Sequence, residues 1–145
     1  MYTLKTMKEK RLTFPPVEWE KIAWEKTPYK GVFIYKLEEK LDPSNPNIPF
    51  FTVIALKVES GAEIPLHKHN RESKWKEALT MPQGGNFEIL SGKEAVTILT
   101  KHSFSKTISS RKIFGIRNLD TAPLYFYSTM RPGFTGYQEI EEIRR

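Results

Sequence analysis

The feature that most constrains the fold is a series of short segments in which apolar and polar residues alternate. They lie at residues 32–37, 50–58, 64–69, 86–90, 95–100, 106–108, 113–117 and 124–129. Successive side chains of a β-strand point to opposite faces, so alternation of this kind is typical of strands with one buried face. Many short strands at close spacing predict an all-β protein, either a sandwich or a barrel.

Turn-forming residues separate these segments. The run Asp42-Pro43-Ser44-Asn45-Pro46-Asn47 predicts a loop, and Gly92 and residues 120–123 mark further breaks. Helix is predicted only as a short N-terminal piece at 17–26 and a turn at 139–145. The length of 145 residues suits a single domain. We therefore expect one domain over 1–145, with residues 1–30 as an N-terminal extension.

Composition excludes several kinds of site and partner. The chain has no cysteine, which rules out disulfides, thiolate metal ligands and a cysteine nucleophile. Its formal charge of +6 is spread over basic residues that alternate with acidic ones, as in Lys8-Glu9-Lys10. This pattern favours a solvated surface over a nucleic-acid-binding groove. No signal peptide and no long apolar run is found, so we expect a cytoplasmic protein without a membrane partner.

The segment most informative about chemistry is Gly61-Ala62-Glu63-Ile64-Pro65-Leu66-His67-Lys68-His69. Residues i and i+2 of a strand share a face, so His67 and His69 are predicted to point together into the barrel. Two imidazoles on one strand can chelate a divalent metal if other strands supply more ligands. They can equally be polar residues of a wet cavity that bind water or an organic ligand.

A glycine, five residues and His-x-His resemble the first sequence motif of the cupin superfamily. Glu88-Ile89-Leu90-Ser91-Gly92 resembles the end of that motif, and Phe114-Gly115-Ile116-Arg117-Asn118 resembles the end of the second cupin motif. The resemblance covers roughly residues 50–130. It implies an antiparallel cupin or jelly-roll β-barrel that holds a small molecule.

The sequence also departs from the cupin pattern at its metal ligands. Phe114 replaces the family's third histidine, and the position of the usual glutamate falls near Gly84 and Gly85. The chain carries an insertion after His69, which contains Glu72 and Glu77. We expect residues 70–85 to form a mobile flap, from which Glu72 or Glu77 can join His67 and His69 at a metal. The cofactor would be a divalent ion such as Zn²⁺, Mn²⁺, Fe²⁺ or Ni²⁺, bound weakly or not at all.

Two functions follow from the resemblance. The first is binding of a small molecule in the barrel without turnover, with His67, His69, Phe114, Tyr125 and Arg117 as the expected ligand contacts. The alternative is a metal-dependent isomerase, epimerase or dioxygenase acting on a small polar or anionic substrate. Loss of two family ligands favours the first, and the sequence does not decide whether the protein is an enzyme. Because cupins often pair through edge strands, we expect a homodimer to which Trp19 and Trp24 contribute.

Overall fold

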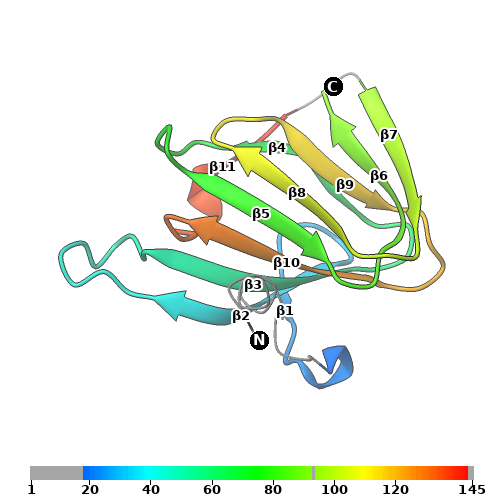
Figure 1. Cartoon of the computed structure of the whole chain (residues 1–145), viewed down its shortest axis with the longest axis horizontal. Coiled ribbons are helices and arrows are strands. Elements are labelled where there is room, and N and C mark those ends of the chain that lie inside the picture. Colours follow the sequence, from blue (N-terminus) through cyan, green and yellow to red (C-terminus); the bar gives the residue numbers. More distant parts are fainter. Residues whose placement is uncertain (1–17, 93, 144–145) are drawn as a thin grey trace, which may run out of the picture.

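Two antiparallel sheets face each other in a computed structural model that describes residues 18–92 and 94–143 (Figure 1). The first sheet contains, in spatial order, β1 (Glu25–Lys26), β2 (Val32–Lys40), β3 (Phe51–Val58), β10 (Leu124–Arg131), β5 (Lys76–Met81) and β8 (Phe104–Ser109). The second contains β11 (Ile140–Glu142), β4 (Glu63–His69), β9 (Phe114–Asn118), β6 (Gly85–Ser91) and β7 (Glu94–Thr100). The predicted all-β jelly roll is confirmed, with two sheets rather than one closed barrel.

The main core lies between the sheets because each sheet turns an apolar face inward. Leu79 and Phe126 of the first sheet pack in one cluster with Phe87 and Ile116 of the second. All four side chains are buried. Burial of each such side chain stabilises the fold by about 1.5–3 kcal/mol. Strands β2 and β11 also belong to the sheets, so the fold extends beyond residues 50–130 on both sides.

The N-terminal part is not the helix predicted at 17–26. Residue 17 lies outside the described residues, and the rest forms one 3₁₀ turn, Trp19–Lys21, followed by β1. Trp19 stacks on Tyr125 with ring centroids 4.9 Å apart, and Trp24 Nε1 donates to the Trp19 carbonyl at 3.1 Å. These contacts cover the outer face of the first sheet. An extended path brings both tryptophans onto this surface, and a helix would not.

The segment at 70–85 is not the mobile flap that the sequence predicts. Its residues Lys76–Met81 form β5, which is hydrogen-bonded between β10 and β8 within the first sheet. The side chain of Trp75, just before the strand, is fully buried. The insertion is therefore a structural part of the sandwich.

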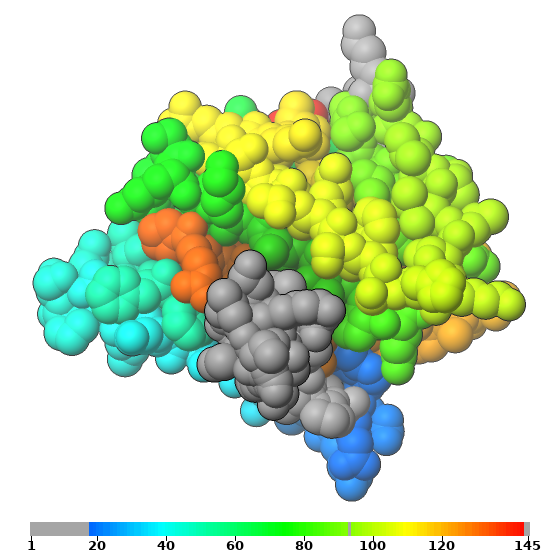
Figure 2. All heavy atoms as spheres, in the orientation of Figure 1, coloured from blue at the N-terminus to red at the C-terminus, as the bar shows by residue number. Residues whose placement is uncertain are grey.

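Strands β2 and β3 extend past the rest of the sandwich, and the loop that joins them protrudes (cyan in Figure 2). A second 3₁₀ turn, Tyr137–Glu139, follows β10 and leads into β11. The turn predicted at 139–145 is therefore wrong in its bounds, because the turn ends at Glu139 and a short strand follows it. Residues 144–145 lie outside the described residues. Within the described part of the chain, no helix is long and apolar enough to cross a membrane.

Candidate functional site: an apolar cavity with two histidines

Strand β4 places two histidines side by side between the sheets. His67 and His69 are both buried, and their ring centroids are 5.3 Å apart. Lys68 between them has its ammonium 3.8 Å from Glu141. The period of two that predicted a shared face for the histidines is therefore present in the structure.

A hydrogen bond at Nδ1 fixes the orientation of each imidazole. His67 Nδ1 lies 2.8 Å from the Pro65 carbonyl oxygen, which can only accept, so Nδ1 carries the proton. His69 Nδ1 lies 2.5 Å from Glu139 Oε2. In the neutral rings, Nε2 is then the unprotonated atom, with a lone pair available to a donor. Burial, the largest influence, lowers the pKa of His67, which keeps this ring neutral near pH 7.

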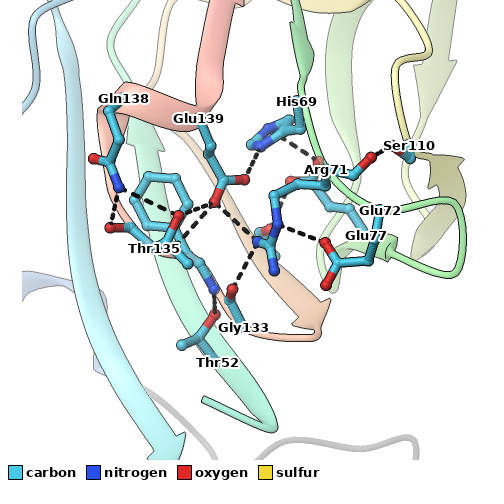
Figure 3. Close-up of polar contacts among 12 residues, drawn as sticks. Thr52, His69, Arg71, Glu72, Glu77, Ser110, Gly133, Thr135, Gln138 and Glu139 are labelled. Atoms are coloured by element: carbon cyan, nitrogen blue, oxygen red, sulfur yellow. Dashed lines mark hydrogen bonds and ion pairs between the residues drawn. The ribbon is translucent and has the colours of Figure 1, made fainter. Parts of the chain in front are cut away.

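Glu139 joins His69 to a buried arginine (Figure 3). Its Oε1 accepts hydrogen bonds from Arg71 Nη1 at 2.9 Å and from the backbone nitrogen and hydroxyl of Thr135 at 3.0 and 2.8 Å. Burial by itself raises the pKa of Glu139. The hydrogen bonds from His69 and Thr135 outweigh that effect, and the pKa is lowered below its ordinary value. Glu139 is therefore an ionised carboxylate that holds His69 in place.

A second carboxylate, Glu77 of β5, approaches the other side of His69. Its Oε2 accepts a hydrogen bond of 2.6 Å from the Ser128 hydroxyl, while its Oε1 lies 3.7 Å from His69 Nε2. That separation is too long for a direct hydrogen bond. Trp75 stacks on His69 with ring centroids 4.6 Å apart, which holds the ring plane from one face.

These groups meet at the end of a cavity of about 70 Å³ between the two sheets. Aliphatic side chains make up much of its wall, together with an aromatic set: Tyr29, Phe114, Phe126, Phe134 and Tyr137. The polar lining residues are Thr27, His67, His69, Glu77 and Ser128. Among the described residues that line it, none is a lysine or an arginine. The volume is enough for a few water molecules or part of a small ligand.

Four residues singled out by the sequence come together here: His67, His69, Phe114 and Glu77 all line the cavity. Phe114 of β9 is the register partner of His67 across the β4–β9 pair. The strands approach closely because residue 115 is glycine, where an added Cβ would lie 2.7 Å from the Ile64 carbonyl oxygen. The position of the family's third histidine is thus directly beside the other two.

Three predicted site residues lie elsewhere. Arg117 forms ion pairs with Glu63 at 3.1 Å and Glu88 at 2.7 Å and does not line the cavity. Tyr125 packs under Trp19 on the outer face of the first sheet. Glu72 accepts a hydrogen bond from Arg71 Nε at 2.9 Å instead of reaching the histidines.

Sequence reasoning missed Glu139, Arg71 and Ser128. Ser128 shares the alternation of β10 with Phe126 and Met130, so the inward face of that strand was a usable signal. No sequence signal could have identified Glu139, because it contacts His69 from a C-terminal turn that carries no motif.

The cupin resemblance implies a metal held by side chains near His67 and His69. Within residues 18–92 and 94–143, no three His, Asp, Glu or Cys side chains are arranged so that they could hold a metal ion. Glu139 is committed to His69 and Arg71, and Glu77 to Ser128. The described residues as arranged do not fit a metal centre.

Comparison with known proteins identifies the fold. No family model matches the sequence, and no significant relative is found among curated proteins. KdgF from Halomonas sp. is similar in structure over 80% of this chain and 90% of its own, with a TM-score of 0.56 and 16% identity. The polyketide cyclase RemF from Streptomyces resistomycificus is similar over 92% of this chain and 87% of its own, with a TM-score of 0.62 and 13% identity.

A third similar structure is an uncharacterized conserved protein with a double-stranded β-helix domain from Klebsiella pneumoniae. It covers 92% of this chain and 99% of its own, with a TM-score of 0.62 and 16% identity. The two facing sheets with a cavity between them therefore define a double-stranded β-helix protein. More particularly, the chain has the fold of the cupin superfamily.

Proposed function

We propose that this chain is a small-molecule-binding protein that holds its ligand in the cavity between the sheets. The observation that carries the proposal is the pair of fixed imidazoles. Hydrogen bonds to Pro65 and Glu139 occupy both Nδ1 atoms, which leaves the Nε2 atoms of His67 and His69 to a ligand. An apolar cavity with a few convergent polar groups is the usual form of a small-molecule site.

The similar structures support the fold and leave the ligand open. They include the polyketide cyclase RemF and a cupin domain of an XRE-family transcriptional regulator from Enterobacter cloacae. A fold that serves such different proteins does not determine function, so the proposal depends on the site itself.

A metal-dependent enzyme is the less supported function. It would require a third protein ligand beside the histidines, and the described carboxylates near them are held by Arg71, Thr135 and Ser128. The anionic substrate that the sequence suggested would meet no lysine or arginine among the described residues of the cavity wall.

Ligand-observed NMR with a library of small neutral, cationic and anionic fragments tests the proposal. We expect hits that compete with one another and that are lost in His67→Phe, which removes the Nε2 acceptor but retains an aromatic ring. His102→Phe is the matched control, because His102 is an exposed histidine in a turn. Hits that persist equally in both variants would refute binding at this cavity.

A further inference from the structure

We propose that the ligand of this cavity is a small organic ammonium ion, a primary amine in its cationic form. The proposal rests on the proposed binding function and names the class of ligand. It is carried by three kinds of observation: the hydrogen-bonding character of the polar end, the balance of charge, and the aromatic walls.

The polar end of the cavity offers acceptors. His67 Nε2 has no hydrogen-bond partner among the described residues, and its side chain is more than nine-tenths buried. The bond to Glu139 engages His69 at Nδ1, so its Nε2 is the ring nitrogen that faces Glu77, with Glu77 Oε1 3.7 Å away. The nearby hydroxyl of Ser128 donates to the other Glu77 oxygen and is not free to donate to a ligand. Three acceptors match a group with three N–H donors.

The gap between His69 Nε2 and Glu77 Oε1 is itself informative. At 3.7 Å the two atoms are too far apart to bond directly, so a donor that contacts both satisfies them together. An ammonium group can do this and still direct a third N–H to His67. An alcohol has a single O–H, and a carboxylate has none, so neither satisfies this set.

Charge favours a cation over a neutral donor. Arg71 and Glu139 are ion-paired with each other at 2.9 Å. Glu77 has no lysine or arginine partner in the cavity wall, since neither residue is among the described residues that line it. A buried carboxylate without a counter-ion is costly, and a ligand cation would offset that cost.

The aromatic walls and the charge of a neighbouring groove also favour an organic cation. Phe134 lies edge-to-face with both His69 and Tyr137, at centroid distances of 6.3 and 5.8 Å. Aromatic faces attract ammonium groups, and aromatic-lined sites are a known means of binding them. A neighbouring surface groove shares Tyr29 with the cavity and carries Glu59, Glu63 and Glu142 against the single lysine Lys30. The local charge is therefore negative in a chain with a formal charge of +6.

The test is calorimetric titration of the full chain after treatment with EDTA. The probes are methyl-, butyl- and benzylammonium, each with its matching alcohol and carboxylate. We expect at least one ammonium to bind at least tenfold more tightly than its alcohol, and no carboxylate to bind. Glu77→Gln should remove the preference for the ammonium and keep the weaker binding of the alcohol. Glu72→Gln is the control, because Glu72 lies on the same segment but outside the cavity.

Any other outcome of these titrations overturns the ammonium ligand, the proposed binding function, or both. An alcohol that binds as tightly as its ammonium overturns the cationic ligand and leaves the proposed binding function standing. If none of the probes binds, both are overturned. Zn²⁺ binding at the histidines without any ammonium binding overturns the ammonium ligand. So does ¹⁵N NMR of the free protein at pH 7 that finds His69 doubly protonated, because Nε2 would then be a donor.

Discussion

The chemistry of single residues in this site is set by partners outside the cavity. Pro65 and Glu139 each occupy one nitrogen of a histidine, and Arg71 and Thr135 in turn hold Glu139. This explains how much of the site the sequence could predict. His67 and His69 are two residues apart on one strand, so their spacing was enough to predict that they share a face. Glu139 and Arg71 take part only because β11 returns to pair with β4, which no local pattern indicates.

Replacing Glu139 should produce a stability defect that depends on pH. The pKa of Glu139 is lower in the folded chain than in the unfolded one, so its ionisation stabilises the fold above the unfolded pKa of about 4.3. That contribution is lost as the pH falls through the folded pKa. We expect Glu139→Gln to lower the free energy of unfolding by about 3 kcal/mol at pH 7, since it removes the buried carboxylate paired with Arg71 and leaves only the more exposed Glu72.

Urea denaturation at pH 7 and at several values below pH 4 measures this effect. The difference from the unmodified protein should shrink at the acid end, where Glu139 is protonated in both states. Glu141→Gln, a change at the exposed neighbouring glutamate, is the control. A defect of the same size at every pH would show that charge on Glu139 is not its cause.

Phe114→His should create a metal site of three histidines. Phe114 faces His67 across β4 and β9 and lines the same cavity as both histidines. Three imidazoles are an established Zn²⁺ ligand set with an open fourth position. Calorimetry should find Zn²⁺ affinity raised at least tenfold, or about 1.4 kcal/mol. His67→Ala in the same background should abolish the gain, and an unchanged affinity in a folded variant would contradict the register.

At the scale of elements, alternation predicted the strands that have an apolar inward face. It missed β5 because the first inward residue of that strand is Glu77, followed at the same face by Leu79 and Met81. A carboxylate at a core position conceals the alternation. Strands β1 and β11 were missed for another reason, since two or three residues are too few to show a period.

Trp75, which directly precedes β5, anchors the segment at 70–85 in the interior of the fold. Its side chain has no exposed surface and stacks on His69. Trp75→Ala should lower the free energy of unfolding by about 3–5 kcal/mol, as other truncations of buried aromatic side chains do. Chemical denaturation followed by circular dichroism measures the loss. Lys74→Ala, at an exposed neighbouring position, should change the free energy of unfolding by no more than about 0.5 kcal/mol. Equal effects of the two substitutions would instead support the mobile flap that the sequence predicts.

At the scale of the whole molecule, the edge strands of the two sheets are β1, β8, β11 and β7 among the described residues. Strand β7 is the edge with large exposed apolar side chains, Val96 at 50% and Leu99 at 71% exposed. An exposed apolar edge strand favours pairing with another chain. Trp19 packs against its own sheet, so β7 is the better candidate surface for the expected homodimer.

The cytoplasmic location and the absence of nucleic-acid partners stay predictions from the sequence.

Light scattering at micromolar concentration should give the mass of a dimer. Leu99→Lys should shift the protein towards the monomer, because a charge on the edge strand opposes pairing. Leu119→Lys is the matched control, since Leu119 is 45% exposed but lies outside β7. A monomer for the unmodified chain would contradict the expectation.

The segment from Phe134 to β11 also determines when the cavity is completed during synthesis of the chain. Phe134, Tyr137 and Ile140 complete the cavity wall, and Glu139 orients His69, yet these residues leave the ribosome long after β4. A nascent chain that ends before residue 134 can pair β3 with β10 but has neither the wall nor the fixed imidazole. Because translation is vectorial, the cavity is incomplete until β11 has emerged and paired with β4.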